Sequence, residues 1–284
     1  MKKLRVGIVG AGNWCENAHI PAYRAMPDDV DIVAISDAEM DRARDVGKRH
    51  DIPLVFHRLE DMINAGNLDI LSIITSRGEH FVPSCQAIKA GLDILCEKPI
   101  GHTLDEAREL VRRLSDTEIV HHVGFTFRYS PAVQYAQRLI AEGFLGDIYH
   151  VQGFEQNGQL ANPDTPLPRR GFSKATDSGA LHGYGSHLID LTRLLCGEFD
   201  RVVGHEATYI KRRKVQEDPA ETREVGVDDS TVWLATFENG AHGVMQASKV
   251  AIGKAPGVEI RLYGSKAALW IRLVESPGGF DRLW

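Results

Sequence analysis

A short glycine-containing run near the N-terminus has the residues needed to bind a phosphate group. The run Gly10-Ala11-Gly12-Asn13-Trp14-Cys15 follows an apolar stretch and opens a helix-like one. Gly10 permits a tight turn, Gly12 lets a ligand approach the backbone, and the start of a helix offers unpaired N–H groups. Cys15 stands where the fingerprint has a third glycine, and its side chain is small enough for helix and strand to pack. The run predicts a dinucleotide site; the alternative is a turn of purely structural glycines.

An acidic residue lies where such a site would need one. Asp37 ends the second apolar stretch, 22 residues after Cys15. A carboxylate at this place accepts hydrogen bonds from the ribose hydroxyls of the adenosine and repels a 2′-phosphate. The sequence therefore favours NAD, and the nearby Arg42 and Arg44 keep NADP open as the alternative.

A lysine and a glutamate follow the fourth apolar strand of the first half. Oxidation of an alcohol needs a group that polarises the oxygen and a base that accepts its proton. Lys98 lies at the carboxyl end of a predicted parallel strand, where ligands of open α/β sheets collect. We predict that Lys98 makes a substrate or catalytic contact, because a lysine before proline at a buried strand end is hard to explain by packing. Glu97 is interpreted as a partner of the cofactor or of the lysine, against the alternative of an ordinary solvated carboxylate.

A histidine in the second half could exchange the proton. His187 stands near the start of an amphipathic stretch after a glycine-rich turn, and imidazole titrates in the range that such an exchange needs. Asp190 lies three residues further on, shares the same helix face and could orient the ring. The alternative is a histidine that caps the helix or fills the core.

Alternating strands and helices must position the first group of residues. Continuous apolar strands with helices between them are typical of a parallel sheet covered on both faces, with right-handed crossovers. Thr103 followed by Glu106 predicts a capping box, and Gly91 predicts a helix end. The expected strands are 4–9, 31–35, 70–74, 93–96 and 119–125, and the expected helices are 13–26, 40–50, 59–65, 81–90 and 103–114.

The pattern changes after about residue 130 to strands joined by tight turns, which indicates an α+β domain with a largely antiparallel open sheet. The basic run 211–214 is interpreted as a solvated hairpin or loop, and 156–170 as a long loop. We therefore expect a dinucleotide-binding Rossmann domain over 1–125 and a substrate-binding and oligomerisation domain over 126–284. The expected helices are 131–142 and 185–195, and the expected strands are 148–154, 201–209, 230–237, 241–248, 258–263 and 267–271.

Composition excludes several classes of protein. The net charge of −6 argues against a nucleic-acid partner, which usually meets a basic face. The four cysteines have no metal-ligand spacing and are predicted to be free thiols in a reducing compartment. No apolar run approaches the roughly 18 residues that span a bilayer, and Met1 is too close to the first strand for a signal peptide. We expect a cytoplasmic protein without a metal site.

Several motifs, in order along the chain, resemble those of the Gfo/Idh/MocA family of oxidoreductases. The resemblance begins with the glycine run and covers essentially the whole chain. The further matching segments are Thr75-Ser76-Arg77-Gly78-Glu79-His80, Glu97-Lys98-Pro99, Gly124 to Pro131, Gly179 to Asp190, Phe237-Glu238-Asn239-Gly240 and Tyr263-Gly264-Ser265-Lys266.

The resemblance implies a two-domain dehydrogenase that moves a hydride between NAD(P) and a hydroxyl or carbonyl of a sugar, sugar derivative or cyclic polyol. It implies that Thr75, Ser76, His80 and Arg128 line the cofactor end of the site. It also implies a homodimer or homotetramer formed by the open sheet of the second domain.

The sequence departs from the family pattern at two places. Gly183 stands where the family has an aspartate four residues before the histidine, and His182 or Tyr184 could substitute for it. The chain also ends at Trp284, before the final segment usual in the family, so it is interpreted as a fragment or a shortened member. These departures keep two alternatives open: a dinucleotide-binding sensor without turnover, and redox-neutral chemistry on glycosides with tightly held NAD.

Overall fold

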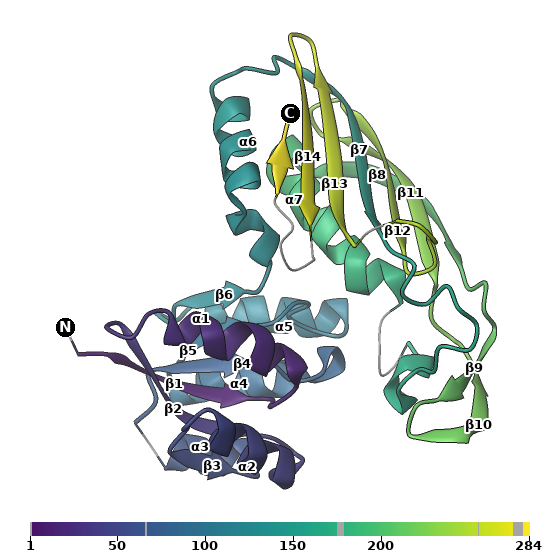
Figure 1. The fold of residues 1–284 in the computed structure, drawn as a ribbon. Coiled ribbons are helices and arrows are strands. Elements are labelled where there is room, and N and C mark those ends of the chain that lie inside the picture. Colours follow the sequence, from purple (N-terminus) through teal and green to yellow (C-terminus); the bar gives the residue numbers. More distant parts are fainter. Residues whose placement is uncertain (1, 66, 175–178, 255, 275–280) are drawn as a thin grey trace. The chain divides into compact units, whose positions relative to one another are not determined.

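The computed structural model describes residues 2–65, 67–174, 179–254, 256–274 and 281–284. The chain forms two compact units, Met1–Gly124 and Phe125–Trp284, which we call the N-terminal and C-terminal units (Figure 1). Among the described residues, no helix is long and apolar enough to cross a membrane.

The N-terminal unit contains a six-stranded sheet in the order β3-β2-β1-β4-β5-β6, with every neighbouring pair parallel. This confirms the predicted doubly wound sheet. The strand order reverses between β1 and β4, which is where ligands of such sheets bind. The strands are β1 Leu4–Val9, β2 Val30–Ser36, β3 Leu54–Phe56, β4 Ile70–Ile73, β5 Asp93–Cys96 and β6 His121–Val123.

Helices cover both faces of this sheet because its central strands are apolar on both sides. Apolar residues of α1 and α2 pack with Val6 and Ile8 on one face, and those of α3 and α4 pack with Val9 and Ile73 on the other. The predicted capping box of α5 and the left-handed Gly91 after α4 are both present. The helices are α1 Ile20–Arg24, α2 Met40–Arg49, α3 Leu59–Asn64, α4 Phe81–Ala90 and α5 Leu104–Leu114.

Two local predictions for this unit differ from the structure in detail, and one strand has no counterpart among the predictions. The helix expected over 13–26 starts at residue 13 as expected but contains a π-helical turn, Cys15–His19, and ends with α1 at Arg24. The expected strand 119–125 shortens to β6, whose two histidines are exposed at the sheet edge. Strand β3 was not expected because three residues are too few for a periodic pattern.

The C-terminal unit contains a seven-stranded sheet in the order β15-β14-β13-β7-β12-β11-β8. All its pairs are antiparallel except β7 with β12, so the sheet is mixed and mostly antiparallel, as predicted. The strands are β7 Ile148–Gln156, β8 Phe199–Ala207, β11 Ser230–Phe237, β12 His242–Ser248, β13 Gly257–Gly264, β14 Ala268–Val274 and β15 Arg282–Leu283.

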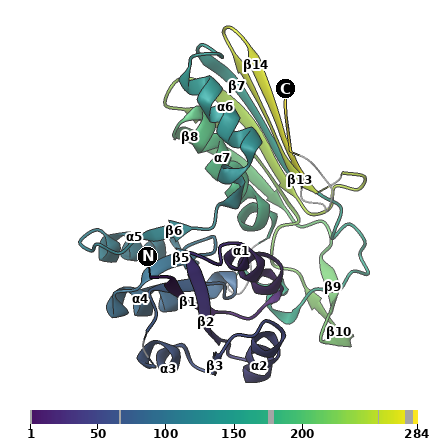
Figure 2. The same ribbon diagram turned by 60° about the vertical axis from the view of Figure 1, so that its left-hand side comes forward.

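Helices α6 (Pro131–Ala141) and α7 (Ser186–Cys196) lie on the same face of this sheet, which we call the inner face (Figure 2). Alternate side chains of the strands, such as Val151, Met245 and Ile260, pack with both helices in the largest apolar core of the chain. The opposite, outer face carries exposed apolar side chains on β8, β11 and β14.

The basic run 211–214 forms part of a two-stranded hairpin, β9 (Arg212–Val215) with β10 (Asp218–Glu224). The interpretation of this run as solvated is wrong for Arg213, which is 1% exposed. Its guanidinium donates to the carbonyl oxygens of Leu160, Asn162 (2.9 Å) and Thr165 (3.1 Å). Burial lowers the pKa of Arg213 below its ordinary value. Charge counting could not detect this residue, because its partners are backbone atoms about 50 residues away in sequence.

Candidate active site

The glycine turn at the end of β1 has the shape of a phosphate-binding loop. Gly10 has φ +101°, and a Cβ there would lie 2.5 Å from the carbonyl oxygen of Ile74. Only glycine therefore fits at position 10. At Gly12 a Cβ would meet no heavy atom within 4 Å, so the backbone is open to a ligand. This open approach fits a dinucleotide pyrophosphate.

Cys15 occupies the third position of the fingerprint as a packing residue. It is fully buried in the core that β1 forms with α1 and α2. Burial, with smaller contributions from Glu16 and Asp37, raises the pKa of the Cys15 thiol to about 12. Its sulfur therefore stays protonated and serves the close packing of helix and strand.

Asp37 joins the end of β2 to the glycine turn. Its Oδ2 accepts a 2.8 Å hydrogen bond from the backbone N–H of Ala11, and its Oδ1 accepts one of 2.8 Å from Glu39. The guanidinium of Arg42 lies 3.3 Å from Oδ1. Each carboxylate oxygen can accept a second hydrogen bond, so Asp37 can fix the turn and still receive a ribose hydroxyl.

Glu97 is held by two side chains of the segment that follows the glycine turn. Its Oε1 accepts from the indole of Trp14 at 2.9 Å and lies 2.8 Å from Nε2 of His19. Its Oε2 accepts from the backbone N–H of Lys98 at 3.3 Å. Burial raises the pKa of Glu97, but the hydrogen bonds from His19 and Trp14 outweigh burial and bring the pKa below its ordinary value. Glu97 is thus an ionised, partly buried link between the glycine turn and Lys98.

His19 was missed by sequence reasoning. It lies one helical turn after Cys15, is 9% exposed, and its Nδ1 is 3.3 Å from the hydroxyl of Ser72 on β4. The spacing of four residues from a buried position is the signal that could have found it. Nothing local in the sequence points to Glu97, 78 residues away, as its partner.

His80 fixes two of the loops at the carboxyl ends of β4 and β5. The ring is 1% exposed, with Nδ1 2.6 Å from the carbonyl oxygen of Pro99 and Nε2 3.1 Å from that of Thr75. Ser76 precedes a short 3₁₀ turn, Arg77–Glu79, that leads into His80. The predicted cofactor-side residues Thr75, Ser76 and His80 therefore form one loop tied to the segment after Lys98.

In the C-terminal unit, His187 stands in the first turn of α7, after a π-helical turn over Leu181–Gly185. Its ring centroid is 4.6 Å from that of Phe127 and 6.0 Å from that of Phe125. Two aromatic rings therefore limit the rotation of the imidazole.

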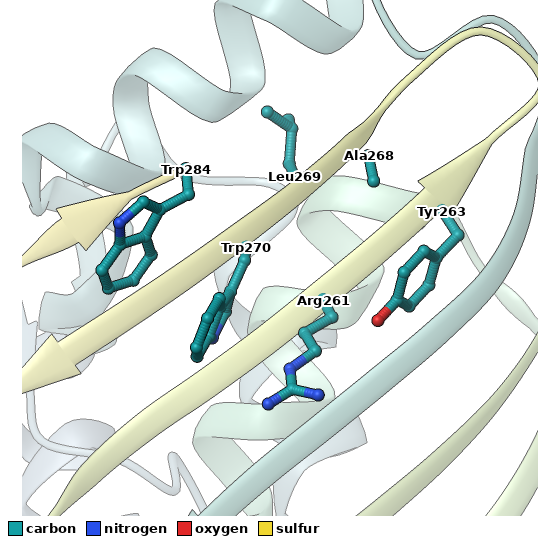
Figure 3. A pocket seen from close by; sticks show the side chains of 6 residues that line it. All are labelled: Arg261, Tyr263, Ala268, Leu269, Trp270 and Trp284. Carbon is teal, nitrogen blue, oxygen red and sulfur yellow. The ribbon is translucent and has the colours of Figure 1, made fainter.

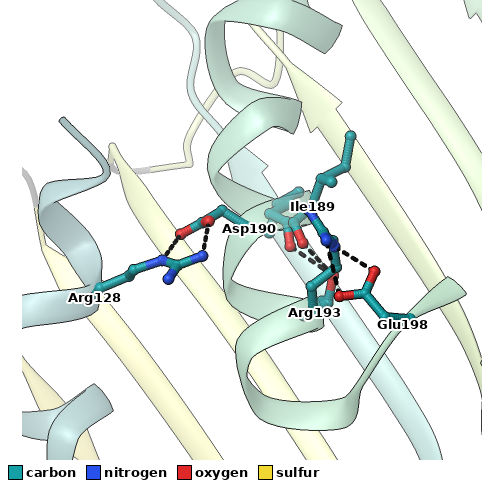
Figure 4. Close-up of polar contacts among 7 residues, drawn as sticks. Arg128, Ile189, Asp190, Arg193 and Glu198 are labelled. Atoms are coloured by element: carbon teal, nitrogen blue, oxygen red, sulfur yellow. Dashed lines mark hydrogen bonds and ion pairs between the residues drawn. The ribbon is translucent and has the colours of Figure 1, made fainter. Parts of the chain in front are cut away.

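The structure brings Asp190 to Arg128 (Figure 4). Nε of Arg128 donates to Oδ2 of Asp190 at 2.7 Å, and Nη2 donates to Oδ1. Asp190 is 5% exposed, and its hydrogen bonds raise the pKa of Arg128. A bidentate pair of this kind is rigid. Both oxygens of Asp190 thus have a partner other than His187, and Arg128 connects α7 to the 3₁₀ turn Thr126–Tyr129.

Tyr184 belongs to a polar group that sequence reasoning only partly found. Its hydroxyl accepts from Nδ2 of Asn157 at 2.7 Å and donates to Oε1 of Gln159 at 3.1 Å. The ammonium of Lys249 lies 5.7 Å from the centroid of its ring. Asn157 and Gln159 lie just beyond the end of β7, in a segment that carries no motif.

A shallow hollow of about 350 Å³ lies on the outer face of the C-terminal sheet (Figure 3). The rings of Trp270 and Trp284 are 4.6 Å apart, and the guanidinium of Arg261 lies 4.6 Å above Trp270. None of the predicted site residues lines it. Within the described ranges, no group of three or more His, Cys, Asp or Glu side chains could hold a metal ion.

Comparison with known proteins identifies the family. Residues 4–125 match the oxidoreductase family with an NAD-binding Rossmann fold, and residues 133–270 match the GFO/IDH/MocA C-terminal domain. The chain belongs to the Gfo/Idh/MocA family of oxidoreductases, as the motifs predicted, and it is an NAD-binding member.

Three relatives illustrate the similarity. Levoglucosan dehydrogenase of Pseudarthrobacter phenanthrenivorans is 29% identical over 287 aligned residues, which cover 95% of this chain and 73% of that protein. Trans-1,2-dihydrobenzene-1,2-diol dehydrogenase of Bos taurus is 28% identical over 251 residues, covering 86% of this chain and 68% of that protein. A solved structure of levoglucosan dehydrogenase in complex with NADH and L-sorbose matches with a TM-score of 0.91 and 28% identity, covering 99% of this chain and 80% of that chain.

Proposed function

We propose that this protein is an NAD-dependent dehydrogenase or reductase acting on a hydroxyl or carbonyl of a sugar, sugar derivative or cyclic polyol. The observation that carries the proposal is the Glu97 link, which ties the glycine turn through Trp14 to the backbone of Lys98. A residue suited to substrate oxygen is thereby built into the same framework as the cofactor loop. The relatives named for levoglucosan and for a dihydrodiol support this substrate class.

The proposed roles follow the chemistry of each side chain. Lys98 binds and polarises the substrate oxygen, and His187 exchanges its proton. Glu97 supports Lys98, and Asp190 holds the helix of His187 through Arg128. Bound NAD supplies the hydride acceptor or donor. Residues 1–125 would hold the cofactor, with Gly10, Ala11, Gly12, Asn13 and Trp14 at the pyrophosphate, and 126–284 would hold the substrate, with Tyr184 among its contacts.

Asp37 favours NAD over NADP in this proposal. Its carboxylate stays near the position of the ribose hydroxyls, because the backbone of Ala11 and Glu39 holds it there. Arg42 is already paired with that carboxylate, which reduces its availability to a 2′-phosphate.

A second candidate function is a dinucleotide-binding sensor without turnover. Asp190 is the only acidic residue in the segment 179–196, and it is paired with Arg128. This pairing favours the sensor, because it engages the one carboxylate of that segment that could otherwise assist proton exchange at His187. A redox-neutral reaction on glycosides, with tightly held NAD, is a further variant.

One experiment separates these functions. The purified protein is assayed for bound nicotinamide, and the absorbance of the reduced cofactor is followed over a panel of sugars and polyols, with Lys98→Ala in parallel. Exchange of the cofactor with turnover, lost in Lys98→Ala, is the expected result. Binding without turnover on any substrate indicates the sensor, and tight unexchanged cofactor indicates redox-neutral chemistry. Full turnover by Lys98→Ala would disprove the role of this lysine.

The outer face of the C-terminal sheet is the proposed homo-oligomer surface. Val203 is 67% exposed and Leu234 is 56% exposed, and they are paired neighbours on β8 and β11. Exposed apolar patches of this kind mark interaction sites. A cytoplasmic homodimer or homotetramer is expected, and light scattering of wild type and Leu234→Glu at several concentrations tests it. An unchanged mass in the variant would contradict the assignment.

A further inference from the structure

One buried carboxylate of the C-terminal unit has no place among the proposed roles. Glu155 is on β7, is 2% exposed, and has both carboxylate oxygens shielded from solvent. Moving a carboxylate out of water is unfavourable, so such a group is kept only where hydrogen bonds or a cation balance it. Its position therefore calls for a functional account.

The register of β7 places Glu155 below the turn that carries His187. Positions 153 and 155 of β7 are buried and lie on the inner face, and the buried Asn157 follows the end of the strand. At Gly153 a Cβ would lie 3.3 Å from the side chain of Leu188, and Asn157 donates to the hydroxyl of Tyr184. Two strand residues span about 6.6 Å, and one helical turn spans about 5.4 Å. Glu155, midway between the two contacts, thus lies under the single turn 184–188.

The strand neighbours of Glu155 cannot balance its charge. In register it stands beside Ala247 on β12 and Val258 on β13, both apolar. The helical turn above it carries polar groups, and Lys249, two residues beyond Ala247, lies over the ring of Tyr184. Glu155 therefore lies on the inner face, beneath the turn where proton exchange is proposed.

Asp190 is already paired through both oxygens with the cationic guanidinium of Arg128, so its charge is balanced without His187. We propose that Glu155 is the positioning carboxylate of His187: it orients the imidazole and balances the positive charge that the ring gains with a proton. This inference rests on the proposed function for its catalytic meaning. When the O–H bond of the substrate breaks, an N–H bond forms on His187. The new charge is then matched by Glu155, and the hydride would leave the substrate carbon for NAD, the cofactor that residues 1–125 would hold.

Other charged or titratable groups act on the same turn and must be separated from Glu155. These are His182 and Tyr184 on the turn, Asp190 on α7, Arg128 on the 3₁₀ turn Thr126–Tyr129, Lys249 after β12, and Asp228, which accepts from the backbone N–H of Leu181. Substitution of Glu155 by glutamine leaves all of them in place.

The first test does not depend on turnover. The titration of His187 is followed by NMR in protein with ¹⁵N-labelled histidine, and its signal is assigned with His187→Gln. Loss of a nearby negative charge destabilises the protonated ring, so in Glu155→Gln the midpoint should fall by about one pH unit or more. Glu259→Gln is the matched control. Glu259 is buried on the adjacent strand β13, faces the outer side and pairs with Lys254 and Arg261, so its loss should leave the midpoint unchanged. An unchanged midpoint in Glu155→Gln would overturn the proposal.

The second test concerns catalysis. In Glu155→Gln, kcat for polyol oxidation should fall by about 10- to 100-fold, a part of what positioned proton transfer contributes. The acid limb of the pH profile should move to lower pH, while the Kd for NAD stays the same. Glu155→Asp should restore part of the rate. If kcat of Glu155→Gln fell equally at every pH and the pH profile did not move, the role of Glu155 would be merely structural. If the wild type turned over no polyol, the proposed function would fail, and the NMR titration would still decide the role of Glu155.

Discussion

The link formed by Glu97 makes a measurable prediction about stability. Glu97→Gln keeps the shape of the side chain and one carbonyl acceptor but removes the charge that accepts from Trp14 and faces His19. Its new amide nitrogen would also face the N–H of Lys98, a second donor. Hydrogen bonds to charged groups contribute about 1.5–3 kcal/mol each to stability. Because the glutamine carbonyl keeps part of this contribution, we expect the free energy of unfolding to fall by about 2 kcal/mol.

The pH dependence gives this prediction its sign. Because the pKa of Glu97 is below 4.5 in the folded protein and close to 4.5 when unfolded, its ionised form favours folding. The contribution is fully present above about pH 4.5 and is lost as the pH falls through the folded value. The difference in free energy of unfolding between wild type and Glu97→Gln should therefore be constant from about pH 7 to 5 and shrink below pH 4.5.

Calorimetry and denaturant unfolding measure this gap. Trp14 is the only tryptophan in residues 1–124. In protein whose other tryptophans are replaced by phenylalanine, the red shift of Trp14 fluorescence on unfolding therefore reports on this unit. A loss of about 2 kcal/mol corresponds to about 6–10 °C in Tm for a unit of this size. Glu60→Gln, which removes an exposed carboxylate bonded to Gln86, is the control and should change stability by about 0.5 kcal/mol or less. A double-mutant cycle with His19→Asn should give coupling of about 0.5–3 kcal/mol. The reasoning is refuted if the cycle shows no coupling, or if the gap is the same at pH 4 and pH 7.

Three further predictions concern single substitutions. Asp37→Ala should weaken NAD binding and reduce discrimination against NADP in isothermal titration; unchanged affinity for NAD would contradict the assignment. Gly10→Ala should abolish NAD binding and lower the Tm, because the added Cβ would lie 2.5 Å from the carbonyl oxygen of Ile74; normal binding with a normal Tm would refute this. Arg213→Leu should lose about 2–4 kcal/mol, because three carbonyl oxygens lose their donor in a buried place; urea midpoints matching the wild type would show that these carbonyls find other partners.

Much of the N-terminal unit could be predicted from the sequence, because its strands are continuous apolar runs and its turns carry their own signals. Strands β1 and β5 have the expected bounds, and Thr103 caps α5 as its spacing with Glu106 required. Local sequence patterns were sufficient to predict an element wherever the contacts that fix its bounds lie within one turn of the chain.

The site could be predicted only in part, because its contacts join distant segments. Arg128 and Asp190 are 62 residues apart, and the partner of each depends on how α7 packs on the sheet. The three-residue spacing of His187 and Asp190 is a true helical relation, yet it could not show that a guanidinium engages the carboxylate. Glu155 gave no signal, because a single acidic residue in a strand resembles an outward-facing one until the register is known.

Arg213 holds the loop of residues 160–165, and this has a consequence for how the sequence of that loop can change in evolution. The guanidinium holds residues 160, 162 and 165 through their carbonyl oxygens, and every amino acid offers the same carbonyl. Substitutions in this loop can therefore alter its side chains without removing the contacts that hold its path. The loop is free to vary in chemistry while its backbone keeps its place, so one fixed arginine leaves a segment of the C-terminal unit open to evolutionary change.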